Sequence, residues 1–223
     1  MKKSIVLLGL FLFTLNLSAQ NNSVKITENG ILFPKLGLGY ERAINDNYTA
    51  GITLGGIIPR SFSLNSDELG SDATLKVSGF NTILDFRKYT DSAFDGFFLA
   101  SHVKGSRYSF DYLERDLSGG YEFGMSFSTV GLGFNLGWSA ILFDVVTLDV
   151  IAFGLGYDFH ILDAYVDNAE ISQADIDAFT NSLSEVPIIG KRFEFNETGD
   201  GYELDSVFGL PSFRFGFSLG YAF

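Results

Sequence analysis

The chain has 223 residues, no cysteine and a formal net charge of −12, which excludes a disulfide-stapled fold and the basic surface that nucleic-acid binding requires. It is 46% hydrophobic and contains 25 Gly and 24 Phe, unlike the Leu-, Ile- and Val-rich core of most soluble proteins. A chain rich in both Gly and Phe favours strands with aromatic side chains toward lipid and small ones on the opposite face.

The first 19 residues have the order of a secretory signal peptide. Lys2 and Lys3 precede an apolar run over residues 5–13, which is too short to span a bilayer as a helix. Its Leu-Ser-Ala-Gln ending at residues 17–20 is similar to signal-peptide ends common in Bacteroidota. We therefore expect an exported domain over residues 20–223, with a net charge of −14 once the two lysines are removed.

Seven segments before residue 160 alternate apolar residues with small or polar ones, the period of two that predicts a β-strand. In the clearest of them, Leu132, Phe134 and Leu136 alternate with Gly and Asn. Bulges are expected at Gly55-Gly56 and near Ile151-Ala152, where the alternation is interrupted. The segments are residues 24–27, 36–41, 48–55, 80–87, 97–104, 131–138 and 146–159.

Residues 158–206 form an expected long acidic loop, with twelve Asp or Glu and two basic residues. Ser172 and Asp175 have the spacing of a helix cap and precede apolar residues spaced by three and four, which predicts one short amphipathic helix. Residues 193–195 and 202–204 flank a turn, which predicts a hairpin that extends the last two strands.

The same loop contains one candidate calcium site. Asn196 and Asp200 have the spacing of ligands in an EF-hand loop, but Val207 occupies the position that needs a bidentate Glu. We therefore expect a solvated extracellular loop and no resident metal or other cofactor, with Ca²⁺ binding as the alternative.

Residues 212–223 alternate without interruption, with five aromatic residues and one Leu on one face and Gly, Ser, Ala and Arg214 on the other. An apolar outer face opposite a small or polar inner face is typical of a narrow membrane barrel. The alternative is a strand of a soluble barrel or sandwich, whose wet face would then consist of poor strand formers. Tyr221 and Phe223 resemble the C-terminal signal that the outer-membrane barrel assembly machinery recognises.

The connections alternate in length along the chain. Those at residues 45–47, 90–93 and 142–144 are short, whereas residues 59–73, 109–122 and 160–206 are longer. Outer-membrane barrels have short periplasmic turns and longer extracellular loops. The sequence therefore predicts an all-β fold, an eight-stranded antiparallel transmembrane barrel, whose first strand ends at a turn at Asn29-Gly30.

Several motifs resemble those of a family of small, uncharacterised outer-membrane barrels of Bacteroidota. The resemblance implies an eight-stranded barrel in the outer membrane of a Gram-negative bacterium and carries no agreed activity. The motifs that carry it are Leu38-Gly39-Tyr40-Glu41-Arg42-Ala43, residues 133–138 and 153–157, and the closing residues 210–214 and 220–223.

With aromatic faces toward lipid, the opposite faces place charged residues inside the barrel. An eight-stranded barrel is just wide enough for side chains, so these charges must pair with one another or with trapped water. We expect a closed, salt-bridged interior with Glu41, Arg87 and Arg214 near its middle; the alternative is a narrow channel or a ligand-binding barrel. The interior set is Lys35, Glu41, Asp85, Arg87, His102, Lys104, Asp149 and Arg214.

The two histidines are the candidate catalytic residues, because some small barrels modify lipid A. Ser101 and His102 are adjacent in one strand, so their side chains point to opposite faces and cannot form a nucleophile–base pair. His160 lies near Asp158 and Asp163 at the expected barrel mouth without an obvious Ser partner. We therefore expect no catalysis and retain a lipid A-modifying enzyme as the alternative.

These patterns together predict a protein with a structural or interaction role through its extracellular loops. The expected partners are outer-membrane lipid and lipopolysaccharide, the barrel assembly machinery during biogenesis, and an extracellular partner that the sequence does not identify. A secreted soluble barrel is the alternative that detergent-free fractionation would detect. The sequence predicts no oligomeric state.

Overall fold

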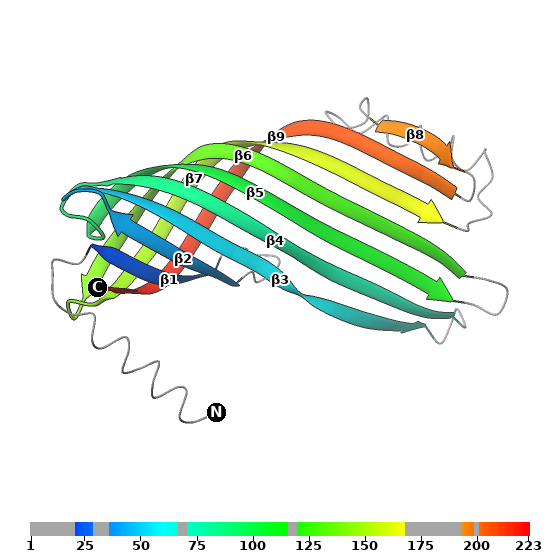
Figure 1. The fold of residues 1–223 in the computed structure, drawn as a ribbon, viewed down its shortest axis with the longest axis horizontal. Helices are drawn as coiled ribbons and strands as arrows, with labels where there is room; N and C mark the ends of the chain where they lie inside the picture. The colour runs from blue at the N-terminus through cyan, green and yellow to red at the C-terminus, as the bar shows by residue number, and fades with distance from the viewer. Residues whose placement is uncertain (1–20, 29–35, 67–70, 116–119, 168–192, 199–200) are drawn as a thin grey trace, which may run out of the picture.

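One antiparallel sheet makes up the fold (Figure 1), in a computed structural model that describes residues 21–28, 36–66, 71–115, 120–167, 193–198 and 201–223. Its strand order is β1-β2-β3-β4-β5-β6-β7-β9-β8, and an additional β1–β9 pairing closes the sheet on itself. The strands are β1 (Asn22–Glu28), β2 (Leu36–Ala43), β3 (Tyr48–Ser66), β4 (Ser71–Tyr89), β5 (Gly96–Arg115), β6 (Gly120–Leu142), β7 (Val146–Asp167), β8 (Phe193–Thr198) and β9 (Gly201–Ala222).

Eight of these strands form the barrel, as predicted, and β8 pairs only with the start of β9. The first strand includes the predicted residues 24–27, and the β8–β9 pair is the predicted hairpin. Asn22 and Phe223 hydrogen bond through their backbones at 3.0 and 2.8 Å, so both ends of the described barrel lie together, at what we call the terminal end. β1 and β2 have 7 and 8 residues, so they close the wall only near this end.

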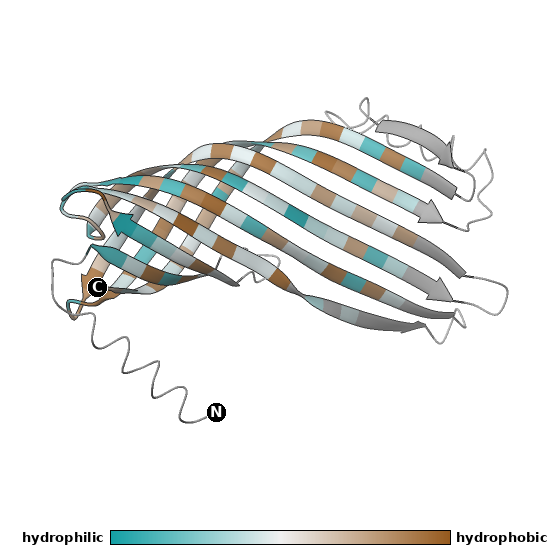
Figure 2. Cartoon of the chain, viewed as in Figure 1, coloured by the Kyte–Doolittle hydropathy of each residue, from teal (hydrophilic) through white to brown (hydrophobic). Residues whose placement is uncertain are grey.

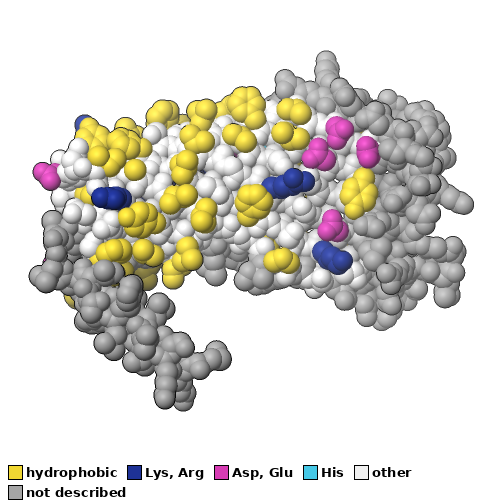
Figure 3. All heavy atoms as spheres, viewed as in Figure 1, with side chains coloured by type: hydrophobic (Ala, Val, Ile, Leu, Met, Phe, Trp, Pro, Cys, Tyr) yellow, Lys and Arg dark blue, Asp and Glu magenta, His cyan; other side chains and the backbone are white. Residues whose placement is uncertain are grey.

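Side chains alternate between the two faces of the wall. On β6, Leu132, Phe134 and Leu136 are 55–61% exposed on the outside, whereas Asn135 between them is 2% exposed. The alternation is visible as bands along each strand (Figure 2). Figure 3 shows apolar side chains gathered over the part of the barrel nearer the terminal end. Most of the Asp and Glu side chains visible in this view lie toward the far end.

The strands extend farther than predicted, so several segments that were expected as loops are paired strands of long hairpins. β5 and β6 pair from Gly96↔Ser139 to Arg115↔Gly120, and β7 and β9 pair up to Asp167↔Gly201. The physical reason is that the pattern inverts toward the far end. There the inner face is apolar, with Tyr108 opposite Phe127, and the outer face is polar. The alternation of the segments nearer the terminal end therefore no longer applies.

Of the two predicted bulges, one lies at its predicted position and the other is displaced along its strand. The one in β7 is confirmed, because the register shifts between Ile151 and Gly154. The one in β3 lies between Ile57 and Arg60 rather than at Gly55-Gly56. Pro59 lies at the shift and has no N–H to donate to the ladder, which explains the irregularity there.

Short turns connect the strands at the terminal end, and two of them hold Phe in a left-handed backbone. Phe143 and Asp144 have φ values of 53° and 64° between β6 and β7, and Phe94 has a φ of 68° between β4 and β5. The described residues include no helix with the length and apolar character to cross a membrane. The expected signal peptide, the Asn29-Gly30 turn and the expected helix after Ser172 lie outside the described residues.

Candidate functional site: the charged interior of the barrel

Five charged side chains meet inside the barrel near its terminal end. They come from inward positions of four strands, because the alternation of each strand turns these residues away from the apolar outer face. All five are at most 7% exposed. This charge network consists of Lys25 on β1, Glu41 on β2, Asp85 and Arg87 on β4, and Asp149 on β7.

The network crosses the interior from one wall to another. Lys25 Nζ lies 2.5 Å from both Glu41 Oε2 and Asp149 Oδ2. Arg87 Nη1 lies 2.8 Å from Asp149 Oδ2 and 3.2 Å from Glu41 Oε2, and Arg87 Nε lies 2.5 Å from Asp85 Oδ1. Because β4 and β7 are separated by two strands on one side and by four on the other, the Arg87–Asp149 pair spans the space between walls.

Neutral donors complete the coordination of the buried carboxylates. Tyr89 Oη donates to Glu41 Oε1 at 2.8 Å, and Thr49 Oγ1 donates to the same atom. Ser139 Oγ donates to Asp149 Oδ1 at 2.6 Å. A buried ion pair is tolerated when additional hydrogen bonds satisfy its remaining lone pairs, and both acids meet that condition.

Phe94 covers the network from the terminal end. It belongs to the β4–β5 turn, yet its side chain is fully buried and lies 6.4 Å from the Tyr89 ring centroid. Lys25 Nζ lies 5.6 Å from the centroid of the Phe94 ring, a cation–π distance. Ser139 Oγ lies 2.8 Å from the Phe94 carbonyl oxygen, within hydrogen-bond distance, so the turn is held against the inner wall.

A second polar layer lies farther along the interior. Lys104 Nζ lies 2.5 Å from Asp158 Oδ2. With its amide oriented to suit both neighbours, Asn135 accepts hydrogen bonds from His102 Nδ1 and Arg214 Nη1, each at 3.1 Å. This layer therefore links β5, β6, β7 and β9.

The predicted interior residues divide between these two layers. Glu41, Asp85, Arg87 and Asp149 meet in the charge network, and His102, Lys104 and Arg214 lie in the second layer. Glu41, Arg87 and Arg214 were expected near the middle of the interior. Glu41 and Arg87 meet in the charge network, and the guanidinium of Arg214 contacts Asn135 in the second layer. Lys35 lies outside the described residues.

Sequence reasoning missed two interior charges, Lys25 and Asp158. Lys25 alternates with the outward Val24 and Ile26, so the phase of its strand was the signal that could have placed it inside. Asp158 was expected in the acidic loop, but it lies in β7 and is 5% exposed. With both included and Lys35 outside the described residues, the described interior holds four acids and four bases, where the sequence predicted three acids and four bases.

His160 points inward and has a hydroxyl partner that the sequence did not indicate. Its Nδ1 lies 2.9 Å from Thr129 Oγ1, and its ring lies 4.8 Å from Phe127 and 5.1 Å from Phe208. The sequence could not indicate this pair because Thr129 is on the neighbouring strand. In the described ranges no group of three or more His, Asp or Glu could hold a metal ion. Asn196 lies in β8 and Asp200 is outside the described residues, so the candidate calcium site stays a prediction.

Comparison with known proteins identifies a family. A family model described as protein of unknown function (DUF3575) matches residues 5–179. The chain belongs to this family. No curated protein matches this DUF3575 member. It is similar to the N-terminal β-barrel domain of Pseudomonas aeruginosa OprF, with 9% identity, 92% of this chain and 98% of that chain covered, and a TM-score of 0.33. It is also similar to the translocator domain of the autotransporter NalP from Neisseria meningitidis, with 12% identity, 100% and 96% covered, and a TM-score of 0.41.

Proposed function

We propose that this DUF3575 protein is an outer-membrane barrel with a non-conducting interior, which acts through the surface that it presents outside the cell. The observation that carries the proposal is the charge network, because its ion pairs occupy the space through which a pore would pass. The expected source, a Gram-negative bacterium of the Bacteroidota, stays a prediction.

The outer surface supports placement in a membrane. Large apolar side chains are exposed on every barrel strand, including Ile26, Leu38, Leu54 and Phe213 at 56–66%. Soluble monomers rarely expose a continuous apolar surface larger than a few hundred Å². A bilayer removes this surface from water, and the closed β1–β9 pairing leaves the barrel without a free edge at that level.

Two features support an occluded interior. The buried ion pairs reach across the narrow barrel, and Phe94 covers them from the terminal end, which is the periplasmic end in this proposal because its turns are short. Separating these charges in the low-dielectric interior would leave several of them unpaired, at a cost of about 3–5 kcal/mol for each broken pair. The closed arrangement is therefore the stable one.

The far end supports an interaction role outside the cell. On its outer face, Asp163 and Asp205 are direct cross-strand partners. Both line one pocket together with Glu203 and Arg107. Adjacent carboxylates at this height would attract the divalent ions that lipopolysaccharide holds. An extracellular partner would meet an acidic surface here.

Planar-bilayer recording with purified, refolded protein tests the proposal. The wild type is expected to give no steady conductance, whereas the Glu41→Ala, Arg87→Ala double variant, which removes one acid and one base, is expected to give measurable conductance. Lys76→Ala changes an exposed residue of the same strand as Arg87 and serves as the matched control. Large, steady conductance of the wild type would contradict the proposal, and recovery of the protein without detergent would contradict membrane placement.

The proposal includes no catalytic step. Ser101 is exposed on the outer face and His102 is buried on the inner face, so these neighbours do not form a nucleophile–base pair. The mass spectrum of lipid A is expected to be the same whether the gene is deleted or overexpressed. A mass change that follows gene dosage would favour the enzyme alternative.

A further inference from the structure

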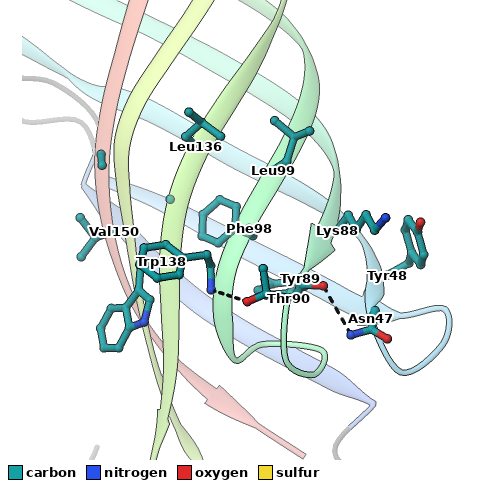
Figure 4. A pocket seen from close by; sticks show the side chains of 13 residues that line it. Asn47, Tyr48, Lys88, Tyr89, Thr90, Phe98, Leu99, Leu136, Trp138 and Val150 are labelled. Atoms are coloured by element: carbon teal, nitrogen blue, oxygen red, sulfur yellow. Dashed lines mark hydrogen bonds between the residues drawn. The ribbon is translucent and has the colours of Figure 1, made fainter.

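A groove of about 890 Å³ lies on the outer face of the barrel near its terminal end. This volume falls within the range of about 300–1,000 Å³ that ligand sites commonly have. The groove crosses β3 to β7 and is bordered by outward side chains from each of these strands (Figure 4). Its outward side chains include Tyr48, Lys88, Leu99, Leu136, Trp138 and Val150.

Strand pairing arranges these residues in two rows. Tyr48 pairs with Lys88, Lys88 with Leu99, and Leu99 with Leu136, which forms the row farther from the terminal end. Trp138 pairs with Val150 and with Phe97 in the row nearer the terminal end. Adjacent strands are about 4.8 Å apart, so β4 and β6 place Lys88 and Trp138 on opposite sides of the groove, about 10 Å apart in the sheet direction.

The two polar side chains on opposite sides of the groove, Lys88 and Trp138, both carry hydrogen-bond donors. Lys88 Nζ lies 5.6 Å from the Tyr48 ring centroid and forms no ion pair within the described ranges. The indole N–H of Trp138 is a donor only, and Trp138 is 39% exposed. None of the residues that line the groove is Asp or Glu. The groove thus combines apolar walls with a positive charge and selects for an amphipathic ligand with an anionic head.

The donor side is held in place by the neighbouring turn. Asn47 Nδ2 donates to the Asp91 carbonyl at 2.9 Å, and Thr90 Oγ1 accepts from the Phe97 N–H at 3.1 Å. The Asn47 bond ties the β2–β3 turn to the β4–β5 turn, and the Thr90 bond closes the β4–β5 turn itself. Asn47 Nδ2 also donates to the Tyr89 carbonyl at 3.4 Å (Figure 4). A site whose frame is already ordered loses less entropy when a ligand binds.

We propose that this groove binds one phospholipid of the periplasmic leaflet, with the phosphate at Lys88 and an acyl chain along Leu99 and Leu136. The inference rests on the proposed membrane placement. Lys88 and Trp138 lie at the level where membrane proteins concentrate aromatic and basic anchors, and the Leu99–Leu136 wall extends from there toward the hydrocarbon. The positive charge of Lys88 among apolar walls complements a lipid phosphate, and a second copy of the chain over the groove is an outcome that the test distinguishes.

Native mass spectrometry of the detergent-solubilised protein with added phosphatidylglycerol tests the site. The wild type is expected to retain one phosphatidylglycerol and to prefer it at least tenfold over diacylglycerol with the same chains. Lys88→Gln is expected to lose at least tenfold of this retention. Arg42→Gln is the matched control, because Arg42 is an exposed cation near the same end that does not line the groove.

Leu99→Trp provides a second variant, which fills the groove without changing the charge and is expected to expel the lipid. Equal retention by wild type and both variants would overturn the inference, as would equal retention of diacylglycerol or a dimer that covers the groove. The two proposals are separated by reconstituting the protein into liposomes and comparing its electrophoretic mobility with and without heating, which reports whether the barrel has inserted and folded. A protein that inserts but retains no lipid contradicts only the lipid site, whereas a protein that does not insert contradicts the membrane placement.

Discussion

Lys25 Nζ lies 2.5 Å from Asp149 Oδ2, although the two residues are 124 positions apart in the chain. They are on β1 and β7, the two barrel strands that flank β9, so the ion pair passes over the inner face of β9 at the point where the barrel closes. Lys25 pairs in register with Gly220, and Asp149 pairs with Ser218. The small inner face of the last strand therefore provides the room that this ion pair needs.

Lys25→Met is expected to destabilise the barrel by about 3–5 kcal/mol, because Glu41 and Asp149 lose a buried cationic partner. Urea unfolding followed through Trp138, the sole tryptophan of the chain, measures the change. Adding Glu41→Gln to Lys25→Met is expected to cost less than the sum of the two single changes, because the pair is removed without altering the net charge of the network. Lys76→Met, at an exposed site, is the control. Equal midpoints for the two lysine variants would refute a structural role of the network.

Gly220→Ala tests whether room on β9 is required. A Cβ atom at Gly220 would lie 2.7 Å from Lys25 Cγ, 2.5 Å from Thr147 Oγ1 and 2.7 Å from the Val24 carbonyl oxygen. Two of these three atoms belong to a strand backbone or a packed stem, so we expect a loss of about 1–3 kcal/mol from overpacking.

Gly105→Ala is the matched control for that change, because a Cβ atom there meets no heavy atom within 4 Å. Ala restricts the unfolded chain more than Gly, so this variant is expected to gain about 0.4–1 kcal/mol. If both alanine variants unfold at the same urea concentration, space over β9 does not limit the packing of Lys25.

Much of the barrel could be predicted because a wall with an apolar outer face and a small or polar inner face imposes a period of two on each strand. Leu132, Phe134 and Leu136 alternate with small residues, and this pattern alone located β6 and its inward face. The same phase argument identified Glu41, Arg87 and Asp149 as interior residues. Their mutual contacts could not be predicted, because strand register around a closed barrel depends on pairings between distant segments.

Two features of the structure could not be predicted from the period-two alternation. The far-end hairpins have an apolar inner face and a polar outer face, so Tyr108 and Phe127 interrupt the pattern of the strands to which they belong. Phe94 lies in a turn, where alternation has no meaning, and only the three-dimensional arrangement directs its ring into the barrel.

Phe94→Ala is expected to destabilise the protein by about 3–5 kcal/mol, because it removes a fully buried ring and leaves a cavity over the charge network. Phe143→Ala provides a close control. Phe143 is also a turn residue with positive φ at the same end, but it is 90% exposed. Thermal unfolding of the two variants in the same detergent compares them directly. A similar effect of both substitutions would show that burial of the Phe94 ring contributes nothing.

The β6–β7 turn offers a stabilising substitution. Phe143 and Asp144 both have positive φ, the conformation of the two central residues of a type I′ turn, which favours Asn-Gly. Side chains with a Cβ are strained in this conformation, at about 1–2 kcal/mol per residue, and Asn and Gly tolerate it better. Because Phe143 packs against little, the double change Phe143→Asn, Asp144→Gly is expected to raise stability by about 1–2 kcal/mol. Phe143→Ala, Asp144→Ala keeps both β-carbons and is expected to give no gain. An equal gain from the two double variants would assign the effect to removal of the exposed Phe ring rather than to relief of backbone strain.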